Sequence, residues 1–306
     1  MRAAVVTSFG GPEAVRIVET EVPEPGAGQV RIKVAAATLN PVDAGVRAGA
    51  FGGEGRRLGL GWELAGTVDA VGPEGKEEKE EKEEKGRWAV GDEVVALAHG
   101  PLKDLGAHAE YVVVDAGAVA PAPASVDAVH AASLPLNALS ADQALDALDL
   151  KPGASLLVTG AAGAVGGYAI ELAVRRGIEV TGLARPADEE LVRSLGARFV
   201  SGAVGPGGYD AVLDAAVLGA TALRWVRDGG SYIGLIPQAH PAAERGVRTD
   251  SIEVRADGAR LGQLVALVDE GVLTTRVAGT YALDDAARAH ERLAEGGVRG
   301  RLVLVP

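Results

Sequence analysis

The chain has 306 residues, 47% hydrophobic and 4% aromatic, which predicts two domains with cores built mostly from alanine, valine and leucine. Its formal net charge of −12 argues against a nucleic-acid partner, because phosphate binding needs clustered lysine and arginine. The absence of cysteine excludes disulfides and thiolate metal sites. Neither a signal-peptide pattern nor a run of about 18 apolar residues is present, so we expect a cytoplasmic protein that has a small-molecule substrate and no membrane partner.

Up to about residue 119 the sequence predicts a β-rich domain. Short alternating or β-branched runs are interrupted by glycine and proline, and long helical patterns are nearly absent. The predicted strands lie in AAVVTSF, QVRIKVAAATL, LAGTVDAV, DEVVALA and HAEYVVVD.

From about residue 120 onward, helical patterns alternate with short apolar strands, which is typical of βαβ units and a parallel sheet. Predicted strands are SLLVT, EVTGLA, ARFV, AVLDA, SYIGLI and SIEV, and predicted helices span roughly 164–176, 187–195 and 219–226. A helix at 257–270 and the strand RLVLVP then return to the first domain. We therefore predict an α/β protein with a β-rich domain at 1–119 and 256–306 and a doubly wound domain at 120–255. Cofactor and substrate are expected to meet in a cleft between them.

One low-complexity segment, KEEKEEKEEK at residues 76–85, separates two predicted strands. Its glutamates and lysines are spaced four apart in the order that favours a helix. A docking arm is one interpretation, but a solvated excursion of a hairpin is favoured.

A glycine-rich segment, LLVTGAAGAVGGYAIELA, joins a predicted strand to a helical pattern. Gly160, Gly163 and Gly166 stand at the junction and match the dinucleotide fingerprint G-x-G-x-x-G, with the first glycine one place early. The first glycine permits a tight turn, the second lets a pyrophosphate approach the helix N-terminus, and the third lets the helix press against its strand. A structural turn is the alternative, but strand, turn and helix in register favour nucleotide binding.

The end of the second predicted strand indicates which nucleotide binds. An NAD site usually carries a carboxylate there, whereas this strand ends at Ala184 and Arg185, and Asp188 comes later. A guanidinium pairs with a 2′-phosphate that a carboxylate would repel. The sequence therefore favours NADPH over NADH, the alternative being that Arg185 is an ordinary surface arginine.

These motifs together resemble the medium-chain dehydrogenase/reductase superfamily, and specifically its zinc-independent quinone oxidoreductase branch, which is zeta-crystallin-like and NADPH-dependent. The resemblance runs through the whole chain and implies a GroES-like β-rich domain and a Rossmann domain. The segments that carry it are LLVTGAAGAVGGYAIELA, TLNPVDAGVRAG, GWELAGTVDAVG, AVGDEVVAL, AHAEYVVV, SLPLNALSADQAL, YDAVLDAA, GGSYIGL and GGVRGRLVLVP.

The resemblance also implies a set of site residues. Asn40 and Asp43 are expected to face the nicotinamide, and Ser140 stands where the branch usually has threonine, so that these three are the catalytic candidates. Asn40 before a proline is also typical of a simple turn. Expected contacts of the cofactor are Asn40, Ser140, Thr159, Gly160, Ala161, Ala162, Gly163, Ala164, Val165, Gly166, Ala184, Arg185, Leu235 and Ile236.

Two related enzyme classes do not fit the sequence. Zinc alcohol dehydrogenases bind zinc through cysteines and a Gly-His-Glu turn, but the matching turn here carries Trp62 and the five histidines lack metal-ligand spacing. Trp62 is expected in the pocket or in the core. Short-chain dehydrogenases need a Tyr-x-x-x-Lys pair, which the sequence lacks.

The predicted function is hydride transfer from NADPH to a quinone or an α,β-unsaturated carbonyl, without metal, by proximity and orientation. The alternative is a protein that binds NADPH in a regulatory or non-redox biosynthetic role. The resemblance further implies a homodimer formed edge to edge through SYIGLI and SIEV.

Overall fold

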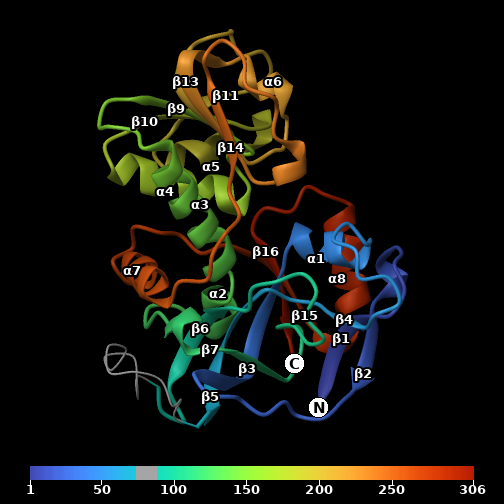
Figure 1. Ribbon diagram of the computed structural model, residues 1–306. Coiled ribbons are helices and arrows are strands. Elements are labelled where there is room, and N and C mark those ends of the chain that lie inside the picture. The colour runs from blue at the N-terminus through green and yellow to red at the C-terminus, as the bar shows by residue number, and fades with distance from the viewer. Residues whose placement is uncertain (74–87) are drawn as a thin grey trace. The chain divides into compact units, whose positions relative to one another are not determined.

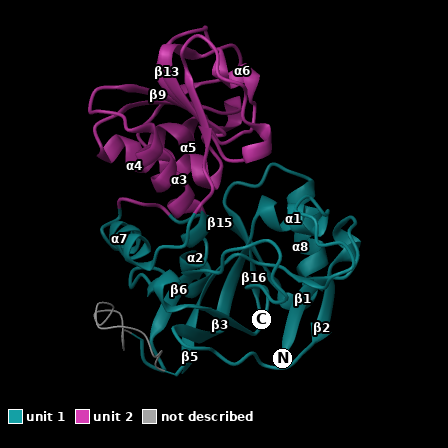
Figure 2. Ribbon diagram, viewed as in Figure 1, with its two compact units in different colours: residues 1–136, 255–271, 275–306 teal, residues 137–254, 272–274 magenta. Residues whose placement is uncertain are grey.

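The computed structural model describes residues 1–73 and 88–306, which form two compact units (Figure 2). Unit 1 contains residues 1–136, 255–271 and 275–306, and unit 2 contains residues 137–254 and 272–274. The charged segment at 76–85 lies outside the described residues. This division groups residues 120–136 with unit 1, and the boundaries predicted from sequence at 119 and 255 stay predictions. Within the described ranges no helix is both long and apolar enough to cross a bilayer.

Unit 1 is built mainly from antiparallel strands (Figure 1). Its strands are β1 (Arg2–Val6), β2 (Arg16–Glu19), β3 (Gln29–Leu39), β4 (Leu58–Gly59), β5 (Glu63–Val71), β6 (Glu93–Leu97), β7 (Tyr111–Asp115), β8 (Val119–Pro121), β15 (Val277–Ala282) and β16 (Arg301–Val305). Its helices are α1 (Pro41–Arg47), α2 (Ala128–Ala131), α7 (Gly258–Asp269) and α8 (Ala286–Ala294).

The long strand β3 is the centre of unit 1. It pairs antiparallel with β5, β7 and the C-terminal strand β16, and it belongs to a sheet in the order β15-β16-β3-β5-β6-β8. Its alternating residues Val30, Ile32 and Val34 are buried in a valine- and alanine-rich core, as the period of a half-buried strand requires. Since β3 ends at Leu39, it delivers Asn40 to the start of α1.

Unit 2 is a six-stranded parallel sheet with the strand order of a doubly wound nucleotide-binding fold. The strands are β9 (Ser155–Thr159), β10 (Glu179–Leu183), β11 (Arg198–Val200), β12 (Tyr209–Asp214), β13 (Val226–Gly234) and β14 (Arg248–Ser251), in the order β11-β10-β9-β12-β13-β14. The order reverses between β9 and β12. Ligands of such sheets bind outside the carboxyl ends of the strands at this reversal.

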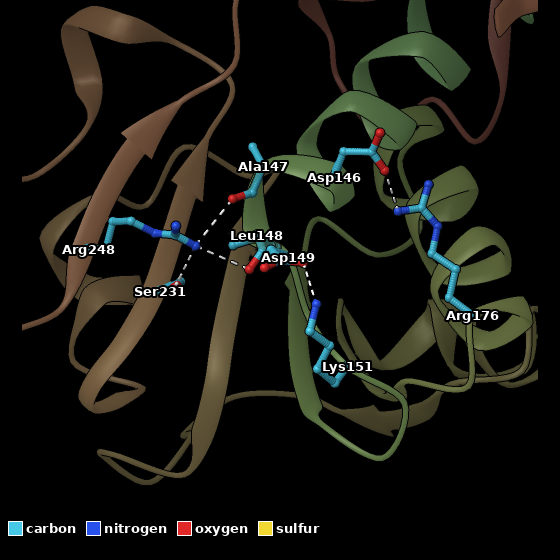
Figure 3. Close-up of polar contacts among 8 residues, drawn as sticks. All are labelled: Asp146, Ala147, Leu148, Asp149, Lys151, Arg176, Ser231 and Arg248. Atoms are coloured by element: carbon cyan, nitrogen blue, oxygen red, sulfur yellow. Dashed lines mark hydrogen bonds and ion pairs between the residues drawn. The ribbon is translucent and has the colours of Figure 1, made fainter.

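The helices of unit 2 are α3 (which begins in unit 1 and spans Pro135–Leu148), α4 (Ala164–Arg175), α5 (Glu189–Ser194) and α6 (Ala220–Leu223). Polar contacts fix α3, the helix that carries Ser140 (Figure 3). The Arg248 Nη2 atom donates to the carbonyls of Ala147 and Leu148, each at 3.2 Å, and so satisfies the last turn of α3. Arg176, just after α4, pairs with Asp146 at 2.8 Å.

Several sequence predictions are wrong in detail. The helix predicted at 219–226 is the single turn α6, because Val226 already pairs with Tyr209 as the first residue of β13. The strand predicted as SIEV is β14, three residues earlier, because β13 ends at Gly234 and offers no further partners beyond Ser251 and Ile252. SYIGLI is consequently not an edge strand, since β14 covers it. The strands β2, β4, β8 and β15 and the helices α1, α2, α3 and α8 were not predicted from the sequence.

Candidate functional site

The glycine turn follows β9 at the carboxyl end of the sheet, beside the reversal of strand order. Gly160 adopts φ +59°, a left-handed conformation that favours glycine. A Cβ on Gly166 would lie 2.3 Å from the Gly160 carbonyl oxygen, so only glycine lets α4 pack this closely. Both observations match the roles predicted for these two positions.

A side chain at Gly163 would press against the turn itself. A Cβ there would come within 4 Å of one atom outside its chain neighbours and helix among the described residues, the Gly160 oxygen at 3.0 Å. Gly163 is exposed and is the N-cap of α4, with no side chain to occupy the amides of the first turn. Unsatisfied amides and the positive end of the helix dipole together bind a phosphate. The geometry therefore fits a dinucleotide pyrophosphate.

The remaining residues predicted around the pyrophosphate lie in the same turn. Thr159 is fully buried, whereas Val165 is partly exposed. The alanines Ala161, Ala162 and Ala164 are buried and leave no large side chain over the turn.

A buried network that the sequence analysis missed supports the turn from β12 and β13. The Thr159 hydroxyl donates to Asp214 at 2.6 Å, and the Tyr232 hydroxyl donates to the same carboxylate at 2.8 Å. Asp214 also accepts the amide of Gly219 at 2.8 Å. Burial, followed by the Asp214 contact, raises the pKa of Tyr232, so the phenol stays protonated as a donor. The sequence signal that could have indicated this role is the position of Asp214 at the end of a predicted parallel strand, next to the reversal of strand order.

Arg185 follows β10 at the same edge of the sheet. Its side chain is 61% exposed, and its Nε atom donates to Asp188 Oδ2 at 3.1 Å. Asp188 is 2% exposed and is the N-cap residue of α5. The buried carboxylate orients an exposed guanidinium, while Ala184 beside it is partly exposed. The 2′-phosphate contact of Arg185 stays a prediction with a suitable geometry.

Three further predicted contacts belong to unit 2. Leu235 is partly exposed and Ile236 is 44% exposed, directly after the end of β13. Ser140 is buried at 8% exposure on α3. An exposed isoleucine at the carboxyl end of a strand suits contact with a flat ring, and the roles of all three residues stay predictions.

In unit 1, Asn40 and Asp43 are held in a buried network at the start of α1. Asp43 accepts hydrogen bonds from two backbone amides, that of Asn40 at 2.8 Å and that of Gly61 at 2.7 Å, one on each carboxylate oxygen. The Asn40 Nδ2 atom donates to Glu63 at 2.7 Å. Both oxygens of Asp43 are thus committed to backbone, which gives this residue a positioning role. Direct contact of Asn40 or Asp43 with a substrate stays a prediction.

Glu63 links this network to the following segment. It is fully buried, and its second oxygen accepts the amide of Leu136 at 2.7 Å. Burial raises the pKa of Glu63 to about 7, opposed by the hydrogen bond from Asn40 and the charge of Arg301. In the sequence Glu63 is only the last residue of the turn Gly61-Trp62-Glu63, and its position between Asn40 and Leu136 follows only from these contacts.

Trp62 precedes Glu63 and is 6% exposed. Its ring packs edge-on against His99 with centroids 5.2 Å apart, and the ammonium of Lys103 lies 5.1 Å from the ring centroid. Trp62 therefore has the buried environment expected of a core residue, with polar neighbours.

The donor set of this chain does not fit a zinc site. The chain has no cysteine, and the turn that would supply a ligand carries Trp62. Within residues 1–73 and 88–306, no three histidine, aspartate or glutamate side chains gather as metal ligands would. His108 and His290 are both 1% exposed inside unit 1.

Two family models match the chain: "Alcohol dehydrogenase GroES-like domain" over residues 26–124 and "Zinc-binding dehydrogenase" over residues 186–304. The chain is 33% identical to the NADPH-dependent alkenal/one oxidoreductase of Arabidopsis thaliana, over 100% of this chain and 80% of the relative. It is similar to the solved quinone oxidoreductase of Coxiella burnetii, with 27% identity, a TM-score of 0.86 and coverage of 100% and 99% of the two chains. A mycobacterial protein solved in complex with NADPH has 26% identity, a TM-score of 0.83 and complete coverage of both chains.

Proposed function

Because the chain belongs to the zinc-independent quinone oxidoreductase branch of the medium-chain dehydrogenase/reductase superfamily, we propose that it is an NADPH-dependent reductase of quinones or α,β-unsaturated carbonyls. The observation that carries the proposal is the N-cap Gly163, which is exposed and has no side chain over the first turn of α4, next to the carboxyl end of β9. The names of the relatives, an alkenal/one oxidoreductase and a quinone oxidoreductase, support the substrate class. The NADPH complex of a structural neighbour supports the cofactor.

The residues of unit 2 bind and orient the cofactor. The first-turn amides of α4 bind the pyrophosphate, and the exposed guanidinium of Arg185 pairs with the 2′-phosphate. The hydrogen bond between Thr159 and Asp214 holds the end of β9, where the turn begins. When bound, NADPH supplies the hydride, so that the protein contributes proximity and electrostatics. Electron-poor acceptors suit this site, because their added charge spreads onto an oxygen that one donor can stabilise.

The proposal is tested by mixing NADPH-loaded protein with 1,4-quinones and with 2-alkenals and following cofactor absorbance. We expect NADPH oxidation that depends on the acceptor and needs no added metal. Retention of NADPH with every acceptor tested contradicts the proposal and favours the non-redox binding protein instead.

Replacing Arg185 by alanine tests the cofactor assignment separately. We expect NADPH affinity to fall about tenfold while NADH affinity stays the same, because only the phosphate contact is lost. The matched control is Arg193→Ala. It removes a 57% exposed arginine of α5 that pairs with Glu189 of the same helix. Equal losses in both variants, or none in Arg185→Ala, rule out the 2′-phosphate contact.

We also infer a cytoplasmic location and, in keeping with the resemblance, a homodimer. Strand β14 lies at the end of the parallel sheet and so has one backbone edge available for a second copy. Size-exclusion chromatography with light scattering checks the assembly, and a single species of 31.0 kDa rules it out.

A further inference from the structure

Lys103 lies in the segment between β6 and β7, on the side of unit 1 that carries Trp62. Its ammonium donates to the carbonyl of Ala98 and sits 5.1 Å from the centre of the Trp62 ring. Its own carbonyl accepts the amide of Gly59 at 2.8 Å, which fixes the backbone. Lys103 as a whole residue is partly exposed.

The charge of Lys103 is weakly compensated. Within the described ranges, no carboxylate forms an ion pair with its ammonium; the charge that most opposes deprotonation is that of Asp43 on α1. His108, the other titratable group that interacts with it, has a pKa that burial lowers, so it stays neutral near pH 7. Burial lowers the pKa of Lys103 itself to about 7. The ammonium is thus a much stronger acid than an ordinary lysine.

Neither Asn40 nor Asp43 can supply a proton as readily, and Glu63, whose pKa is also about 7, is fully buried with its two oxygens accepting hydrogen bonds from Asn40 and Leu136. The side-chain Nδ2 atom of Asn40 donates to Glu63 at 2.7 Å, and both oxygens of Asp43 accept hydrogen bonds from backbone amides. The Ala98 carbonyl takes one hydrogen of the Lys103 ammonium, which has three donors in all. Lys103 interacts electrostatically with Asp43, which accepts the backbone amide of Asn40, so Lys103 belongs to the same part of unit 1 as the predicted nicotinamide contact.

We propose that Lys103 binds the carbonyl oxygen of the acceptor and donates the proton that completes its reduction, an inference that rests on the proposed function. In an α,β-unsaturated carbonyl, the incoming hydride forms the new C–H bond at the β-carbon. The π electrons move toward the carbonyl and leave an enolate. A Lys103 N–H bond then breaks and its proton passes to the enolate oxygen, giving an enol and a neutral amine. The enol tautomerises to the saturated carbonyl as the α-carbon takes a proton from water and the hydroxyl releases one. Water restores the ammonium, so one hydride and one proton are consumed per turnover.

The decisive comparison is Lys103→Met against Lys33→Met, which removes an exposed lysine from β3. With a 2-alkenal as acceptor, we expect kcat to fall about 10²- to 10⁴-fold in Lys103→Met and to stay unchanged in the control. NADPH affinity should be the same in both, because Lys103 does not bind the cofactor. Added ethylamine should restore part of the rate to Lys103→Ala, which a purely structural role does not predict.

The pH profile gives a second readout. The acid form is needed, so kcat of the wild type should decline as pH rises through about 7, and this decline should move to higher pH in Lys103→Arg. A wild type that oxidises no NADPH with any acceptor overturns the proposed function. Normal wild-type activity with an unchanged rate and pH profile in Lys103→Met overturns the role of Lys103 alone.

A measurement on the wild-type protein keeps the inference testable even if Lys103→Met unfolds. Lysine side chains labelled with ¹³C-methyl groups are titrated by NMR, and the Lys103 signal is assigned by its absence from Lys103→Arg. We expect one lysine to titrate near pH 7. Titration of every lysine near its ordinary value, about 10.4, overturns the proton-donor role.

Discussion

Replacing Gly166 by alanine probes the packing of the glycine turn most directly. A Cβ at this position would lie 2.3 Å from the Gly160 oxygen and 3.0 Å from the Ala161 Cα atom. Since real Cβ atoms essentially never approach closer than 3.0 Å, the helix and the turn must separate by about 0.7 Å. The atoms that must move are backbone, so the strain cannot be relieved by a side-chain rotation.

The matched control is Gly262→Ala in α7, a helix of 12 residues like α4. No atom lies within 4 Å of a Cβ at that site, so alanine gains its usual helix preference of about 1 kcal/mol there. The same gain applies at Gly166, but overpacking costs about 1–3 kcal/mol. We therefore expect the free energy of unfolding of Gly166→Ala to lie about 1–3 kcal/mol below that of the control.

Urea unfolding measures the stability of both variants, and the fluorescence of bound NADPH measures cofactor affinity. Gly166→Ala should also bind NADPH about tenfold more weakly, a loss of about 1.4 kcal/mol, because the amides of α4 are displaced from the pyrophosphate. Gly262→Ala should bind it normally. If the two variants are equally stable and bind NADPH alike, the argument from the close approach of α4 to the turn is refuted.

Two further predictions concern buried or paired carboxylates. Asp43→Asn should lower the free energy of unfolding, measured in urea, by about 1–3 kcal/mol, because the NH₂ group of the new side chain must face the backbone amide of Asn40 or Gly61. A loss no larger than that caused by the same substitution at an exposed aspartate would contradict this. Asp210, whose pKa is lowered to about 2 chiefly by hydrogen bonds from the Ser155 amide and Arg227, should stabilise the fold above pH 4 and lose this contribution as pH falls toward 2. Asp210→Asn should therefore cost about 1–2 kcal/mol at pH 7, a figure reduced for the exposure of this pair, and almost nothing at pH 2. If the loss of unfolding free energy in Asp210→Asn is the same at pH 7 and pH 2, the ionised carboxylate of Asp210 is not its cause.

The sequence was most informative where local chemistry dictates the backbone. The segment from Ser155 to Arg175 combines a buried apolar strand, glycines at the turn and a helical period, and each of these follows from neighbouring residues. The parallel sheet could be predicted for the same reason. The family resemblance, carried by motifs along the whole chain, identified the enzyme class.

The missed features depend on contacts between distant residues. Asp214 meets Thr159 across 55 residues of sequence, and the Lys103 ammonium meets the Trp62 ring only because two loops of unit 1 come together. The start of β14 is fixed by hydrogen bonds to β13 rather than by its own polar residues, so the apolar SIEV run misled the prediction. Local propensity carries no information about such partners.

The pairing of β16 with β3 has a consequence for how the polypeptide matures on the ribosome. Leu302, Val303 and Leu304 pair with Leu39, Thr38 and Ala37, directly before Asn40. Synthesis is vectorial, so the segment that precedes Asn40 lacks one of its strand neighbours until β16 has been translated, and all six strands of the unit 2 sheet are synthesised before that point. A chain that stops before residue 301 should therefore keep all six strands of the unit 2 sheet but lack the strand that pairs with residues 37–39, directly before Asn40.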